Sequence, residues 1–280
     1  MSTYNSLQAK IEKRYSHGLS FLTTYTWAHA LDDASDAAGN FTAIGNRNQA
    51  LIPFIDEFTN SAYDVRHRFT FNGNYELPFG RGKAFLHDSR LVDETLGGWS
   101  SSLTFAAQTG TPFTVSPNNS TAANGSARAI PVRDPFGAGG SPDPSNPNVT
   151  CAPATRTKAN WYNPCAFANP LNGSLIGTNG YPSVITDQQT AIAFLGGRSN
   201  NVYGPGYYQV NMSVFKNFPT WREQYLQFRA DGFNVLNHPT LANPSTSNDN
   251  DNGGNITGPK TFQNNTPDAR FFQLSLKYAF

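Results

Sequence analysis

The sequence predicts an all-β protein, an incomplete segment of an antiparallel transmembrane β-barrel with about seven long strands and long extracellular loops. Seven stretches of roughly eleven residues alternate apolar and polar side chains, which is the two-residue period of a strand with one apolar face. At about 3.3 Å per residue each stretch is about 35 Å long, enough to cross an apolar band of about 25 Å when tilted. The connections alternate between short and long, as barrels with short periplasmic turns and long extracellular loops require.

The last of these stretches, residues 268–280, has the clearest pattern. Its apolar face consists of Phe272, Leu274, Leu276, Tyr278 and Phe280. The closing strand of a transmembrane barrel pairs with the first strand while its apolar side contacts lipid. A terminal Phe after alternating aromatic residues also resembles the signal that outer-membrane barrels present to the barrel assembly machinery. The alternative is an amphipathic edge strand of a soluble sandwich.

The other strands and their connections follow from the same alternation and from turn-forming residues. The six further strands are predicted at residues 5–15, 19–31, 66–77, 99–109, 207–217 and 222–233. The short connections at residues 16–18, 78–98 and 218–220 are assigned to the periplasmic side. The long loops at residues 32–64, 110–206 and 237–267 are assigned to the extracellular side.

Seven strands are an odd number, and an open sheet would leave unpaired edges in lipid. We therefore expect this chain to be the C-terminal part of a larger barrel, and residues 1–15 show no signal-peptide pattern. An eighth strand hidden in the longest loop is the alternative.

Composition supports the barrel and excludes other classes. Charged residues make up 14% of the chain and aromatic residues 13%, whereas about 25% charged residues is usual in soluble proteins. Mean hydropathy is −0.48, and no apolar run approaches the roughly 20 residues of a transmembrane helix. A net charge of +1 provides no field for nucleic acid, which we do not expect as a partner.

Two groups of strand residues are expected to have structural roles. Trp27 is predicted at the outer membrane interface, and Trp99 and Trp221 at the periplasmic one, where amphipathic rings are favoured. Four charged residues are predicted to form polar networks in the lumen, with a substrate contact as the alternative: Arg68, Glu76, Arg229 and Asp231.

Cys151 and Cys165 are the cysteines of the chain, and both lie in the longest loop. In an exported loop they predict a disulfide, which stabilises by about 3 kcal/mol in the loop-entropy model. A metal site would need more ligands. Residues 248–254 superficially resemble a calcium loop but lack its closing acidic residue, so a solvated turn is preferred. We find no catalytic motif and expect no cofactor and no enzymatic activity.

Five segments resemble the C-terminal barrel of TonB-dependent outer-membrane receptors, in particular the Oar-like group with a carboxypeptidase-regulatory-like domain. The matching segments are residues 15–30, 64–80, 97–112, 227–239 and 269–280. The resemblance implies a barrel of about twenty-two strands around a plug domain. In that family the plug and the segment that contacts TonB are N-terminal, and we expect neither in these 280 residues.

The resemblance implies a receptor in the outer membrane of a Gram-negative bacterium. Its function would be ligand binding and energised uptake by the full-length protein. Its partners would be outer-membrane lipid, the barrel assembly machinery, the plug and remaining strands of the full-length receptor, and TonB through the N-terminal part. Two alternatives stay open: a surface adhesin or structural barrel that transports nothing, and a secreted carbohydrate-binding β-sandwich.

Overall fold

A single antiparallel sheet of seven long strands organises the molecule, in a computed structural model that describes most of the chain. The described residues are 1–33, 58–80, 83, 85, 95, 97–117, 121–122, 125–126, 128–142, 146–169, 201–221, 223–260 and 269–280. The long strands are β1 (Ser2–Ser16), β2 (Leu19–Asp32), β4 (His67–Glu76), β5 (Trp99–Gln108), β12 (Tyr207–Pro219), β13 (Tyr225–Phe233) and β14 (Phe271–Ala279). They pair in the order β1-β2-β4-β5-β12-β13-β14, and the short β3 (Thr59–Asn60) pairs with β2.

The predicted fold class is confirmed: each of the seven predicted strands is present, and strands that follow one another along this order are hydrogen-bonded neighbours. Several strand boundaries differ from the prediction. β1 begins at Ser2 rather than at residue 5, and β12 continues to Pro219 rather than ending at residue 217. β13 begins at Tyr225 rather than at residue 222, because the chain turns through Thr220 and Gln224. Thr220 N donates to Gln224 O, and Gln224 N donates to Trp221 O, so the backbone groups of this turn pair with each other.

The register keeps most apolar side chains of the seven strands on one face of the sheet, which we call the apolar face. The exceptions on the opposite, polar face are Leu22, Phe215, Phe233 and Phe271. Phe105 lies opposite Phe71 on one side and Val210 on the other, and Met212 lies opposite Leu103. Polar residues alternate with them and share the opposite face. Large side chains on the apolar face are exposed, as in Leu7 (63%) and Leu274 (70%). An exposed apolar face this extensive is typical of a surface that contacts lipid.

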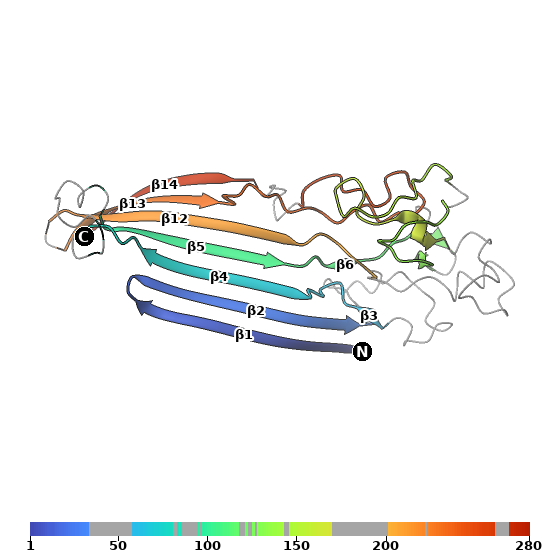
Figure 1. Ribbon diagram of the computed structural model, residues 1–280, viewed down its shortest axis with the longest axis horizontal. Helices are drawn as coiled ribbons and strands as arrows, with labels where there is room; N and C mark the ends of the chain where they lie inside the picture. Colours follow the sequence, from blue (N-terminus) through green and yellow to red (C-terminus); the bar gives the residue numbers. More distant parts are fainter. Residues whose placement is uncertain are drawn as a thin grey trace.

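The two ends of the sheet differ (Figure 1). One end, which we call the turn end, carries the β1–β2 and β12–β13 connections and the C-terminus. There His17 and Gly18 both have positive φ, at 53° and 76°, and form a tight hairpin turn between Ser16 and Leu19. The other end, which we call the loop end, carries the N-terminus and the long connections.

The loops at the loop end fold into a compact unit that the sequence did not predict. We call it the cap: the described residues between 111 and 205 together with residues 239–260. Its core consists of Phe113, Val115, Ala129, Tyr162, Ala166, Phe167 and Val202. Its elements are β6 (Pro112–Phe113) with β11 (Val202–Tyr203), β9 (Ile130–Pro131) with β10 (Phe167–Ala168), β7 (Thr121–Ala122) with β8 (Gly125–Ser126), and the 3-10 helix η1 (Pro164–Ala166).

Buried polar groups and a disulfide hold the cap together. The Tyr162 hydroxyl donates to Ser245 O at 2.9 Å, and burial raises the pKa of Tyr162 well above its ordinary value. Asn163 Nδ2 donates to the carbonyls of Gly137 and Gly139. Cys151 and Cys165 are joined by a disulfide with Cα atoms 5.3 Å apart. The part of the chain that the structure describes has no helix long and apolar enough to cross a membrane.

Candidate functional site

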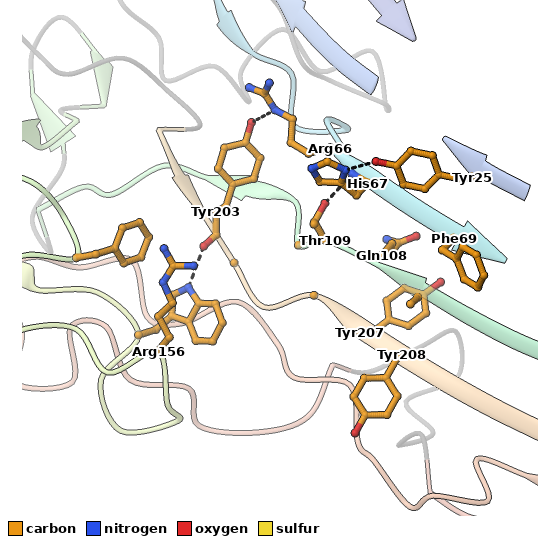
Figure 2. A pocket seen from close by; sticks show the side chains of 16 residues that line it. Tyr25, Arg66, His67, Phe69, Gln108, Thr109, Arg156, Tyr203, Tyr207 and Tyr208 are labelled. Atoms are coloured by element: carbon orange, nitrogen blue, oxygen red, sulfur yellow. Dashed lines mark hydrogen bonds between the residues drawn. The ribbon is translucent and has the colours of Figure 1, made fainter. Parts of the chain in front are cut away.

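A cavity of about 720 Å³ lies where the cap meets the loop end of the sheet (Figure 2). Five strand residues that line it belong to the apolar face: Tyr25, His67, Phe69, Ala107 and Tyr208. The cap contributes Phe136, Arg156, Trp161 and Tyr203. Most of its strand lining therefore comes from the face that contacts lipid, and we call it the outer cavity.

The strand wall of the outer cavity is held by contacts between aromatic rings. The Tyr25 hydroxyl and His67 Nδ1 share a hydrogen bond of 2.8 Å, and their rings are stacked. His67 N donates to Thr109 Oγ1 at 3.1 Å. The ring of Tyr208 stacks on His238 with centroids 4.1 Å apart. Because each of these rings has a fixed neighbour, the strand wall is preformed rather than assembled on binding.

A polar network, which we call the rim network, ties the cap to the sheet beside this cavity. Arg66 Nε lies 2.7 Å from Asp64 Oδ2 and donates to the Tyr203 hydroxyl at 2.9 Å. Tyr203 in turn donates to Asp64, and Arg66 Nη2 is within hydrogen-bonding distance of His29 Nε2 and Asn60 Oδ1. Burial, together with the hydrogen bond to Asp64, raises the pKa of Tyr203 to about 12. Because Arg66 forms an ion pair with the buried Asp64, its charge is neutralised within the rim network.

Trp161 and Arg156 form the cap wall of the outer cavity. Trp161 Nε1 donates to Tyr203 O at 2.9 Å, which links this wall to the rim network. The Arg156 guanidinium lies over the Phe136 ring, with Cζ 4.1 Å from the centroid. Arg156 has a positive φ of 53°, an unfavourable conformation for a residue with a side chain. Among the described residues no carboxylate pairs with Arg156.

A second, smaller cavity of about 210 Å³ lies next to the outer cavity. The strand residues that line it are Gln108 and Tyr207, which share the parity of the polar face, and both also line the outer cavity. Thr240, Asn243 and Lys260 close it from the cap. We call it the inner cavity because its strand residues belong to the polar face.

The two cavities share lining residues at the point where the chain enters and leaves the cap, which we call the neck. Gln108 and Tyr207 are register partners at the ends of β5 and β12. A Cβ at Gly110 would overlap the carbonyl oxygen of Gly204, and a Cβ at Gly206 would overlap that of Gln108. Glycine is therefore required where the two backbones approach each other at the neck.

The four predicted lumen charges all lie on the polar face, but they do not form one network. Arg229 Nε pairs with Asp231 Oδ1 at 2.8 Å, and the Ser213 hydroxyl bridges both residues. Glu76 instead pairs with Lys83 at the turn end, at 2.6 Å. Arg68 is at the loop end, and the described residues hold no ion-pair partner for it. Arg68 and Glu76 stay apart because they are at opposite ends of β4.

The three predicted interface tryptophans lie near strand ends. Trp27 is on the apolar face near the loop end of β2, with 39% of its surface exposed. Trp99 begins β5 at the turn end, where its Nε1 donates to Thr95 O and its edge contacts the Phe228 ring. Trp221 lies in the β12–β13 turn and is exposed. On the final strand Phe272, Leu274, Leu276 and Tyr278 are exposed on the apolar face, and Phe280 follows them.

The asparagine-rich residues 248–254 form a turn within the cap. Asn252 N donates to Asn250 Oδ1, Gly253 N donates to Asn250 O, and Asn146 Nδ2 donates to Asp251 Oδ1. No group of three or more His, Cys, Asp or Glu residues suited to a metal ion occurs within the described ranges.

Sequence reasoning missed the residues that shape the outer cavity. Arg156 and Trp161 lie in a loop with no strand period, and Tyr203 meets Asp64 across 139 residues. One signal was present: the predicted disulfide encloses residues 152–164, so these residues were bound to be held near each other. A closed loop that presents Arg and Trp side chains was a candidate binding surface.

The sequence also matches a known family. The model of the outer membrane beta barrel domain matches residues 1–273, nearly the whole chain. No curated protein matches the chain. The protein belongs to the outer membrane β-barrel domain family, and its sheet is part of a barrel in the outer membrane. By the usual orientation of such barrels, the loop end is extracellular and the turn end periplasmic.

Proposed function

We propose that this chain is the C-terminal part of the barrel of a TonB-dependent receptor of the Oar-like group. Joined to a plug and further strands, it would bind a ligand at the extracellular end and take part in energised uptake, with no enzymatic step. The observation that carries the proposal is the open sheet, supported by the five family-like segments of the sequence.

The open sheet argues for further strands. Within the described part of the chain, nothing pairs with the outer edge of β1 or with that of β14. Each unpaired backbone group in lipid costs several kcal/mol, so transmembrane sheets close into barrels. Seven strands of this length would enclose too little space for a plug, whereas a receptor of about twenty-two strands encloses one. The open edges therefore support a larger barrel.

Ligand binding is proposed at the polar face of the loop end. Gln108 and Tyr207 of this face line the inner cavity, where Lys260, Asn243 and Thr240 of the cap offer a cation, an amide and a hydroxyl. This face becomes the lumen when the barrel closes, because the apolar face contacts lipid. A ligand held at the inner cavity would lie above the plug and on the uptake route.

The proposal is tested by binding to TonB. Outer membranes that contain the full-length gene product are incubated with the purified periplasmic domain of TonB, and the bound fraction is measured. Membranes that contain the full-length product without its TonB-contacting N-terminal segment are the matched control, because the barrel of this variant still closes in the membrane. We expect saturable binding to the full-length protein and none to the control. Absence of binding to a correctly inserted full-length protein would contradict energised uptake.

A second function, a surface adhesin or structural barrel that transports nothing, is favoured by the cap. A disulfide-closed unit with its own buried core is a rigid surface for contact with other cells or with matrix. Such a protein would insert in the outer membrane without binding TonB, so the same experiment separates the two functions. The secreted β-sandwich alternative is wrong, because the chain belongs to an outer-membrane family.

A further inference from the structure

We propose that the outer cavity binds the phosphate-bearing head group of an outer-leaflet lipid, with Arg156 as the phosphate ligand. The hydrocarbon part of the same lipid would lie along the apolar face below the cavity. The proposal depends on the outer-membrane location and does not depend on transport.

The position of the cavity favours a lipid. Its strand wall is continuous with the apolar face: Phe69 lies opposite Ala107, and the next pair toward the membrane centre is Phe71 with Phe105. A molecule in the cavity therefore lies at the depth where lipid head groups meet hydrocarbon. The row of aromatic side chains that continues toward the membrane centre is next to it. Tyr and Trp rings, which form much of the lining, are favoured at this depth.

The charge of the cavity favours an anionic head group. Two guanidinium groups line it, but the Arg66 charge is neutralised by Asp64. Arg156 has no carboxylate partner among the described residues and stacks on Phe136, which holds its planar group at the cavity. A guanidinium matches two phosphate oxygens and loses little conformational freedom when it is already stacked. A lipid phosphate would supply the counter-ion that the described residues do not provide.

The backbone around Arg156 is fixed in advance. Its φ of 53° is maintained by the turn that follows, in which Thr155 N donates to Asn160 O and Asn160 N donates to Thr157 O. The disulfide between Cys151 and Cys165 closes the loop on both sides of this turn. Strained residues of this kind persist where the surrounding structure holds them, and they are concentrated at ligand sites.

The geometry in Figure 2 defines the two ends of the bound lipid. Arg156 lies on the cap side of the cavity, whereas Tyr25, Phe69 and Tyr208 lie on the strand side. A head group between them would place its phosphate against the cap and its acyl chains against the strands. A free phosphate ion would contact the cap at Arg156 but would have no acyl chains to contact the strands.

The test measures lipid affinity in the protein extracted from outer membranes with a neutral detergent. The probe is a fluorescently labelled, acylated disaccharide that carries two phosphates, and the variants are Arg156→Gln, Lys158→Gln and Ala107→Phe. Lys158→Gln is the matched control, because this exposed lysine of the same turn does not line the cavity. Ala107→Phe fills the cavity floor without a change of charge. Retention of the disulfide and of native protease resistance verifies folding.

Loss of a charge-assisted hydrogen bond predicts that Arg156→Gln raises the Kd of the probe at least about tenfold. Ala107→Phe should also weaken binding, and Lys158→Gln should stay within about twofold of the parent. Removing the phosphates from the probe should match the Arg156→Gln effect in the parent protein. Equal affinity of the parent and Arg156→Gln would overturn the proposal. Displacement of the probe by millimolar inorganic phosphate would overturn the lipid as the occupant and leave a simple anion site.

Discussion

A single residue, Tyr203, connects the cap to the sheet. Its hydroxyl lies between Asp64 and Arg66, just before β4, and its backbone carbonyl accepts a hydrogen bond from the indole N–H of Trp161 in the cap. Its neutral form is favoured, because burial and the neighbouring Asp64 carboxylate both oppose a phenolate. The hydrogen bond from Tyr203 to Asp64, which ties the cap to the sheet, therefore requires that the Tyr203 hydroxyl keep its proton.

High pH should release the cap at this point. The folded pKa of Tyr203 is about 12 and its ordinary value is 10.0. Its contribution to stability is therefore fully present below pH 10 and is lost as the pH rises toward 12. We expect cleavage of the cap by an alkali-tolerant protease to increase between these pH values. Tyr203→Phe should show faster cleavage at neutral pH and a smaller increase above pH 10; an unchanged pH profile would contradict this role.

Replacing both cysteines should loosen the cap and leave the sheet in place. With Cys151→Ser and Cys165→Ser together, the loop-entropy model predicts a loss of about 3 kcal/mol in the free energy of unfolding of the cap. The measurement is denaturant-induced exposure of the cap, followed by Trp161 fluorescence with the other tryptophans replaced by Phe. The disulfide-reduced parent is the control and should behave like the double variant. Equal midpoints for the oxidised parent and the double variant would show that the disulfide does not stabilise the cap.

At the scale of elements, the long strands were predictable because each one carries its own signal. Side chains alternate between lipid and lumen along every strand, so the period of two is visible within eleven residues. The cap carries no such signal, since its core joins Phe113, Tyr162 and Val202, which are far apart in the sequence. The rim network and the outer cavity were not predictable for the same reason, since their residues are also far apart in the sequence.

Strand β14 offers a direct test of which face contacts lipid. Leu274→Arg places a charge on the exposed apolar face near the middle of the strand and should cost about 2–4 kcal/mol. Gln273→Arg, one residue earlier on the polar face and opposite Asp231, is the matched control and should cost far less. Folding free energies in bilayer vesicles measure the difference. Equal costs for the two variants would mean that the faces are assigned wrongly.

At the scale of the whole molecule, the final residue bears on assembly. Phe280 is 99% exposed, and its ring contacts that of Tyr278 in β14, with centroids 6.5 Å apart. We expect Phe280→Ala to lower the amount of protein inserted in the outer membrane without a change in the stability of the inserted fraction. Phe271→Ala, on the polar face of the same strand, is the control. The measurement is the fraction resistant to extraction from outer membranes, and equal insertion of both variants would remove the assembly role.

The neck of the cap has a consequence for how such proteins diversify. The chain leaves β5 at Gln108 and returns to β12 at Tyr207, and these residues are direct partners in the sheet. The intervening segment therefore starts and ends about 5 Å apart. Insertions, deletions or exchange of this segment would leave the register of the strands unchanged. Under selection by phages or antibodies, the segment between Gln108 and Tyr207 could therefore change in sequence while the membrane-spanning strands stay the same.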